Sequence, residues 1–131
     1  MSTTAPASSE VLAFVDDRFS GLARRLEADP SVKQVQVAVA PRRYTTGDRV
    51  ECYADAELVS GNAFAACLDF WFEQGSWIIE SAIVHNTAAG YDDLVELATR
   101  YAEDDGDLAS ELEGATRALA ETTLRLDLSS L

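Results

Sequence analysis

The first apolar pattern along the chain has the spacing of a helix. Ser8 or Ser9 is suited to cap its start, and Asp29-Pro30 ends it, because the residue before a proline avoids the α region. Between these signals, apolar side chains recur at alternating spacings of three and four residues, at Leu12, Val15, Phe19, Leu22 and Leu26. The pattern predicts one amphipathic helix that buries this stripe.

The next four segments alternate between apolar and polar residues, and this period of two is typical of strands. Turn signals separate them at Pro41 to Gly47, at Ser60-Gly61-Asn62 and at Gln74-Gly75, the last of which suits a tight hairpin. Short turns predict an antiparallel meander. The predicted inward sets are Val35, Val37 and Val39; Val50, Cys52, Ala54, Ala56 and Leu58; Phe64, Ala66, Leu68, Phe70 and Phe72; and Trp77, Ile79, Ser81 and Ile83.

Two further helices are predicted after a loop at residues 86–90. Asp92 or Asp93 would start the first of them, where the helix dipole favours acids, and the acidic turn Asp104–Asp107 would end it. Its apolar stripe would be Leu94, Leu97, Ala98 and Tyr101. The second would turn Leu108, Leu112, Ala115, Leu119 and Leu126 inward.

These elements predict an α+β fold: an N-terminal helix, a four-stranded antiparallel β-meander, and two C-terminal helices, with the helices packed on one sheet face. The Phe64–Phe72 side of the third strand should meet them. Residues 1–8 are expected to be a disordered tail, and residues 9–131 a single α+β domain, a size ordinary for one core.

The composition and apolar pattern indicate the cellular compartment and whether a cofactor or metal is expected. Cys52 and Cys67 form neither a CxxC pair nor a metal-ligand spacing, and they are best interpreted as small apolar residues under reducing conditions. The chain shows neither the pattern of a signal peptide nor an apolar run of the roughly 20 residues that a membrane span needs. We therefore expect a cytoplasmic protein without a cofactor or metal.

The net charge of −13 is unevenly distributed. Residues 1–48 hold six acids and six bases, residues 49–90 hold six acids and one base, and residues 91–113 hold nine acids and one base. Nucleic acid and anionic membranes are disfavoured as partners, because binding to them depends on Lys and Arg. General solubility, or adaptation to a salty cytoplasm, is one explanation of the acidity. The other is a localised field that attracts a basic partner.

The helix-free face of the predicted sheet carries the most informative side chains. If Gln74-Gly75 is the hairpin tip, Asp69 lies opposite Glu80 and Trp71 lies opposite Ile78. The preceding strand joins this face only if the Ser60 turn preserves the alternation of its side chains. The predicted partner-binding residues are Glu51, Tyr53, Asp55, Glu57, Asp69, Trp71, Glu73 and Glu80.

The acids of this face would repel one another across the strands, so a raised pKa, a bound cation or a partner's basic group should compensate. Three interpretations of the face remain open. In the first, the acids splay apart and the face is simply solvated. Aromatic residues ringed by polar ones suit a protein interface. A pair of carboxylates could also share acid and base catalysis, which would require a cleft.

Other candidate chemistry is weaker. His85 is the single histidine and cannot make a multi-histidine metal site, so we expect a structural or surface role. Acidic neighbours should disfavour the thiolate of Cys67. Asp104–Asp107 fails the calcium-loop spacing and is expected to be a helix–helix turn. The pair Arg42-Arg43 suits an exposed turn better than a phosphate contact.

The sequence thus favours a non-enzymatic partner-binding protein that presents an acidic surface from residues 49–113 to a basic protein. An immunity-type or antitoxin-type inhibitor of a cationic nuclease would fit, as would an acidic adaptor. One alternative is a small-molecule-binding domain or enzyme with a pocket on the sheet face, lined by Asp69, Glu80, Tyr53 and Trp71. Another is a homodimeric module that associates through helix residues or an unpaired edge strand.

Overall fold

The computed structural model describes residues 7–44 and 47–131, apart from the side chain of Tyr44. Of the predicted tail, residues 1–6 lie outside this description, and only Ala7 and Ser8 belong to it. The elements are α1 (Ser9–Glu27), β1 (Val32–Tyr44), β2 (Gly47–Leu58), β3 (Ala63–Glu73), β4 (Ser76–Thr87), β5 (Gly90–Glu96), β6 (Arg100–Ala102), α2 (Asp105–Leu124) and the short 3-10 helix η1 (Leu128–Ser130).

The predicted first helix is confirmed as α1. The Ser8 side chain caps it by accepting a hydrogen bond from the Val11 backbone N–H at 3.2 Å. Its apolar stripe is buried against the sheet, with Val15, Phe19 and Leu26 at most 2% exposed. The helix ends before Asp29-Pro30, as the sequence predicts.

Within the described residues, six strands form one antiparallel sheet in the order β1-β2-β3-β4-β5, with β6 pairing to β4 beside β5. The predicted four-strand meander is therefore present. β1 continues through Pro41, Arg42 and Arg43 to Tyr44, so these residues are not the turn that the sequence suggested. Gln74 and Gly75 both adopt positive φ, as a two-residue hairpin turn between right-twisted strands requires.

The predicted helix at residues 92–101 is wrong, because this segment forms β5 and β6. β5 pairs with the Ala82–Thr87 part of β4, and β6 pairs with Trp77, Ile78 and Ile79 at its other end. β4 otherwise has a long open edge, and pairing its backbone groups outweighs a helical spacing of only four apolar residues. Val95 packs on the core from β5, and Ala102 is buried on β6.

The last predicted helix is confirmed as α2. Asp104 caps it, since its carboxylate accepts the Asp107 backbone N–H at 2.8 Å. The segment Asp104–Asp107 is thus the cap and first turn of a helix that follows a strand, and it is not a helix–helix turn. The buried positions of α2 include Leu108, Leu112 and Leu119.

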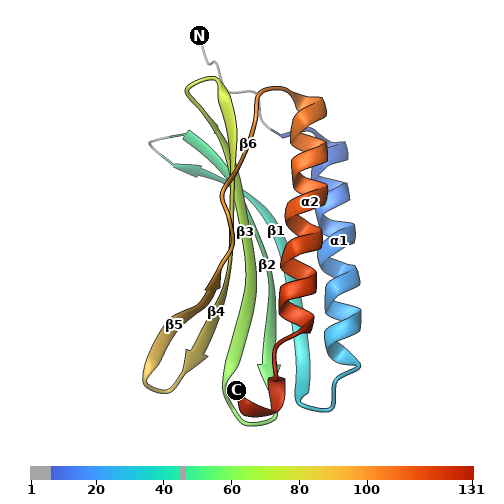
Figure 1. Cartoon of the computed structure of the whole chain (residues 1–131), viewed down its shortest axis with the longest axis vertical. Coiled ribbons are helices and arrows are strands. Elements are labelled where there is room, and N and C mark those ends of the chain that lie inside the picture. Colours follow the sequence, from blue (N-terminus) through green and yellow to red (C-terminus); the bar gives the residue numbers. More distant parts are fainter. Residues whose placement is uncertain (1–6, 45–46) are drawn as a thin grey trace.

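The two helices lie side by side on one face of the sheet (Figure 1). The core lies between these layers and contains the predicted inward side of β3, where Phe64, Leu68 and Phe70 are fully buried. Phe72, at the end of that side, is only half-buried and packs edge-on against the Trp77 ring at 5.4 Å. No helix in the described part of the chain is both long and apolar enough to cross a membrane.

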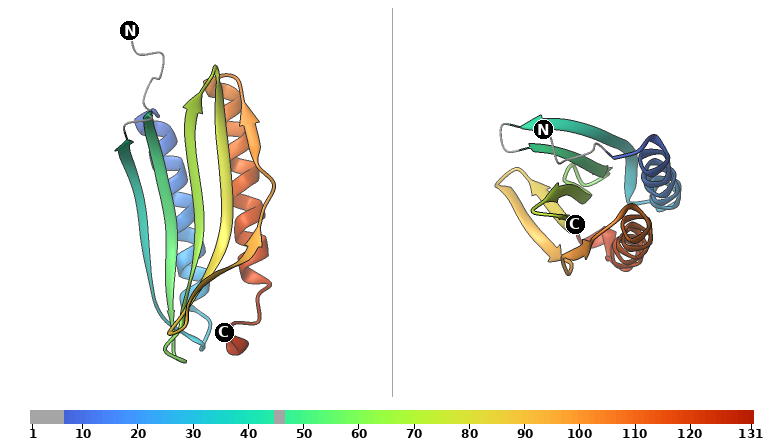
Figure 2. Two further views of the ribbon diagram at one scale, coloured as in Figure 1. Left: turned by 90° about the vertical axis from the view of Figure 1, so that its left-hand side faces the viewer. Right: turned by 90° about the horizontal axis from the view of Figure 1, so that it is seen from above.

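The sheet is strongly twisted, and this twist shapes its helix-free face. The turn-side ends of β1 and β2 and the β4–β5 hairpin lie at opposite ends of the sheet, and both bend away from the helices (Figures 1 and 2). The centre of the helix-free face lies between them. Cys67, Asp69 and Trp71 on β3 are accordingly half-buried, although no helix covers them.

Candidate functional site

The helix-free side of β3 carries the centre of the candidate site. Asp69 lies opposite Glu51 on β2 and Glu80 on β4, which makes a row of three carboxylates across three strands. The next row places Trp71 between Arg49 and Ile78. The predicted pairs Asp69–Glu80 and Trp71–Ile78 are confirmed, and the Val59–Asn62 loop preserves the alternation that brings β2 onto the same face.

We call this surface the acidic face. All eight residues predicted for partner binding lie on it. β5 and β6 add Asp93, Glu96 and Tyr101, which the sequence analysis missed because it assigned their segment to a helix. The carboxylates of the acidic face are Glu51, Asp55, Glu57, Asp69, Glu73, Glu80, Asp93 and Glu96. The cations that pair with them in the described residues are Arg42, Arg49 and Lys33, the last 3.4 Å from Glu57.

Arg49 compensates part of the repulsion from within the chain. Its guanidinium lies 3.5 Å from Asp69 and stacks 4.1 Å above the Trp71 ring. Arg42 pairs with Glu51 at 3.4 Å. A partner is therefore not the only source of positive charge for this row, because two of its three carboxylates already contact arginines of the chain.

Asp69 nevertheless remains in an unfavourable place for a charge. Burial raises the pKa of its carboxyl, and the neighbouring carboxylates of Glu51 and Glu80 raise it further, whereas Arg49 lowers it. The net shift is upward. The raised pKa that the sequence analysis considered as one form of compensation is therefore present at Asp69, and it means that the single ion pair does not cancel the cost of desolvation.

The two cysteines are held as neutral thiols. Burial, with a smaller contribution from Asp69, raises the pKa of Cys67 to about 11 and that of Cys52 to about 12. Cys67 lies on the acidic face, two residues before Asp69 on β3. Cys52 lies in the core. A thiol with so high a pKa contains almost no thiolate near neutral pH, which disfavours nucleophilic chemistry at Cys67.

An open groove of about 380 Å³ lies beside the carboxylate row. It lies at residues 97–99, which connect β5 to β6. The Leu97 backbone N–H donates a hydrogen bond to the Ser81 carbonyl there, at 3.1 Å. Asp69, Glu80 and Glu96 line it together with Cys67. Within the described residues, no group of three or more such side chains is arranged to hold a metal ion.

His85 lies away from the acidic face. It sits opposite Phe64 and in phase with buried Ile83, so its ring is on the helix side of the sheet. Its Nε2 atom is buried without a hydrogen-bond partner in the structure.

Arg43, at the end of β1, pairs with Asp48 at 3.4 Å.

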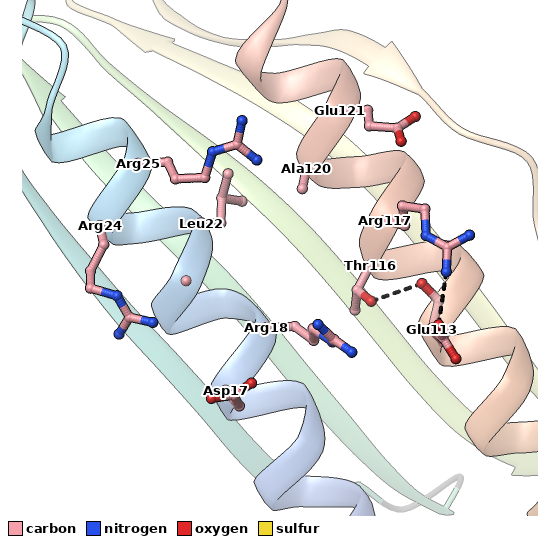
Figure 3. A pocket seen from close by; sticks show the side chains of 11 residues that line it. Asp17, Arg18, Leu22, Arg24, Arg25, Glu113, Thr116, Arg117, Ala120 and Glu121 are labelled. Atoms are coloured by element: carbon pink, nitrogen blue, oxygen red, sulfur yellow. Dashed lines mark hydrogen bonds and ion pairs between the residues drawn. The ribbon is translucent and has the colours of Figure 1, made fainter.

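A second hollow of about 600 Å³ lies on the opposite side of the molecule, between α1 and α2 (Figure 3). Gly21, Leu22, Thr116 and Ala120 contribute small or apolar walls. The charged side chains that line it have both signs: Arg18, Arg24, Arg25 and Arg117, and Asp17, Glu113 and Glu121. Arg117 pairs with Glu113 at 2.7 Å. This hollow has no dominant sign of charge, in contrast to the acidic face.

No protein-family model, curated protein or solved structure matches this chain. The functional proposal accordingly depends on the acidic face and its charges.

Proposed function

We propose that this chain is a non-enzymatic binding protein whose acidic face receives a basic protein. The observation that carries the proposal is the row Glu51–Asp69–Glu80 at the centre of the helix-free sheet face, beside an open groove, with Asp69 half-buried and its pKa raised. An immunity-type or antitoxin-type inhibitor of a cationic nuclease fits this chemistry, as does an acidic adaptor.

The charge of the face favours association in two ways. Its excess of carboxylates produces a negative field that attracts and orients a basic partner before contact. After contact, a guanidinium or ammonium group beside Glu80 and Asp69 would reduce the repulsion within the row. The partner would thus lower the pKa of Asp69 and stabilise its charged form.

Aromatic and apolar side chains give the same face contact area. Tyr53 is 37% exposed and Tyr101 is 63% exposed, and half-buried Trp71 and Ile78 lie beside the carboxylate row. Tyrosine and tryptophan are enriched in protein interfaces because they bury a large area while losing little conformational entropy.

A salt-dependent pull-down with two matched variants tests the proposal. The face variant E51Q/D69N/E80Q removes three charges from the row. The control D17N/E27Q/E121Q removes three charges from exposed positions on the two helices, so both variants have the same net charge. Each protein is immobilised and exposed to native lysate at about 0.15 M salt, where exposed charges are screened beyond about 8 Å.

Wild type and control should retain the same basic protein, which higher salt should elute, and the face variant should lose it. If the control loses it equally, total charge and not the acidic face is responsible. If no basic protein is retained, or if the face variant retains it, the proposed function is wrong.

A small-molecule site is the second candidate, favoured by the groove of about 380 Å³ beside Asp69. A carboxyl with a raised pKa in a cleft is typical of ligand or catalytic sites. Small polyamines such as spermidine would suit its three carboxylates. They should then raise the Tm of wild type more than that of the face variant. Equal shifts would exclude the groove as their site.

A further inference from the structure

β1 leaves one edge of the sheet without a partner. It is 13 residues long, stands at the end of the strand order and pairs only with β2 among the described strands. Figure 2 shows it at the outer margin of the sheet, with no further strand beside it. A long unpaired edge exposes backbone N–H and C=O groups that can pair with another strand.

The two edges of the sheet differ in how they are protected. β5 has only seven residues, carries Asp92, Asp93 and Glu96, and pairs through a register shift. Short length, charge and irregular pairing are the features by which natural sheets prevent edge-to-edge association. β1 has such features only at its ends, where a register shift and Lys33 precede Gln34 and where Pro41, Arg42 and Arg43 follow Ala40. Between Gln34 and Ala40 it contains neither a charged residue nor a proline. This stretch pairs with β2 in unbroken register.

The side chains of this stretch are also incompletely covered. Val35, Val37 and Val39 point to the helix side and pack against the core, yet they remain only half-buried. Since β1 is the last strand, their exposed surface lies toward the open margin of the sheet. A strand added there would bury it, and apolar burial contributes roughly 25 cal/mol per Å².

The stretch is complementary to a second copy of itself. Antiparallel pairing centred on Val37 would place Val35 opposite Val39 and Gln36 opposite Ala38. It would place Gln34 opposite Ala40, so no like charges would be directly opposed within the regular stretch of β1. Acids and bases also balance over residues 1–48, so two chains of net charge −13 repel each other less along this margin than they would across their acidic faces.

We propose that the protein forms a homodimer in which β1 of one copy pairs antiparallel with β1 of a second copy, about a two-fold axis at Val37. The two sheets become one continuous sheet. Because Val37 of each copy points to the helix side, all four helices lie on one face and both acidic faces lie on the other. The dimer thus doubles the acidic surface without covering it.

Paired charge variants test this register. In Q36K/A38K, each introduced lysine is directly opposed by a lysine of the other copy, whereas in Q36E/A38K each lysine is opposed by a glutamate. We expect wild type and Q36E/A38K to have the mass of two chains in light scattering at about 0.15 M salt, and Q36K/A38K to have the mass of one. Circular dichroism and thermal melting check that each variant is folded.

A cysteine pair provides a second test that does not depend on disrupting the dimer. Directly opposed residues of an antiparallel pair have Cα atoms about 4.5–5.5 Å apart, within the range that a disulfide bridges. V37C should therefore form a disulfide-linked dimer under mild oxidation. V35C should not, because its two copies would lie four residues apart along the strands, roughly 13 Å.

A wild-type chain that remains monomeric across a concentration series would overturn the proposal. Equal masses for the two charge variants would overturn it as well. So would cross-linking of V35C as efficiently as V37C. Pairing of β1 with a strand of a different protein, with no self-association, would likewise contradict the homodimer.

Discussion

Asp69 is the residue at which the opposing forces on the acidic face meet. It has a cation 3.5 Å away and carboxylates on both sides, and it is half-buried. Its net pKa shift is upward, so the desolvation of the charge outweighs the ion pair with Arg49. A binding site can retain such strain because a partner relieves it.

The Asp69 pKa shift predicts a pH-dependent gain of stability on neutralisation. Because the pKa is raised on folding, the folded chain holds this proton more tightly than the unfolded chain, and ionised Asp69 disfavours folding at pH 7. D69N should therefore raise the Tm at pH 7, and the gain should shrink as the pH falls from 7 through the raised pKa of folded Asp69, because the folded chain then takes up the proton. Thermal melts across this pH range measure both effects.

Arg49 supplies the control for this measurement. Its guanidinium lowers the pKa of Asp69, so its removal should make the ionised carboxylate still less favourable. The gain from D69N at pH 7 should be larger in an R49Q background than in wild type. A loss of stability in D69N at pH 7 would mean that the ion pair outweighs desolvation, contrary to this account.

The thiols should be inert while the chain is folded. Raised pKa values of about 11 for Cys67 and about 12 for Cys52 leave little thiolate at pH 8. Iodoacetamide should alkylate both far more slowly in the native protein than in denaturant, with Cys67 reacting before fully buried Cys52. Peptide mass spectrometry over time gives the two rates, and rapid native labelling of Cys67 would contradict the raised pKa.

At the scale of elements, the outcome depends on what local sequence can encode. α1 and β1 to β4 carry clear periods of 3.6 and 2, and the hairpin turn at Gln74-Gly75 is a local signal, so these elements and the β3–β4 register were predictable. The end of β1 was not, because the strand continues past Pro41 to Tyr44. Residues 90–102 were not, because Leu94, Leu97 and Tyr101 fit a helical spacing as well. Only the open edge of β4, a tertiary feature, selects the strands β5 and β6.

The misassigned segment also explains which site residues were missed. The acids and aromatics of β2, β3 and β4 were placed by alternation within each strand. Glu96 and Tyr101 reach the acidic face only through pairing with β4, and the groove between β5 and β6 depends on the same pairing. The cation–π contact of Arg49 with Trp71 follows once register is known, since the two are directly opposed.

The start of α2 gives a test of local capping. Asp104 accepts a hydrogen bond from the Asp107 backbone N–H, and loss of such a cap costs about 1 kcal/mol. D104A should lower the Tm by roughly 4 °C in a chain of this size. D105A, which removes an acid from the first turn but keeps the cap, should lower it less. Equal effects would show that Asp104 acts through the helix dipole alone.

At the scale of the whole molecule, two layers separate two kinds of surface. The helix side carries a mixed hollow of alternating signs, whereas the other side carries most of the sheet's carboxylates with Tyr53 and Trp71 among them. The acidic residues of the segment 91–113 fall into two groups. Those of β5 add to the acidic face, whereas those of Glu103–Asp107 lie at the start of α2. The chain therefore offers two acidic regions to a cation.

Amide chemical-shift mapping with an oligo-arginine peptide distinguishes these regions and tests the central claim most directly. At about 0.15 M salt, the account predicts saturable shifts centred on Glu51, Asp69 and Glu80 and on Tyr53 and Trp71, and these shifts should be absent in E51Q/D69N/E80Q. Shifts confined to Glu103–Asp107, or spread over both sides of the molecule, would contradict the acidic face as the binding surface.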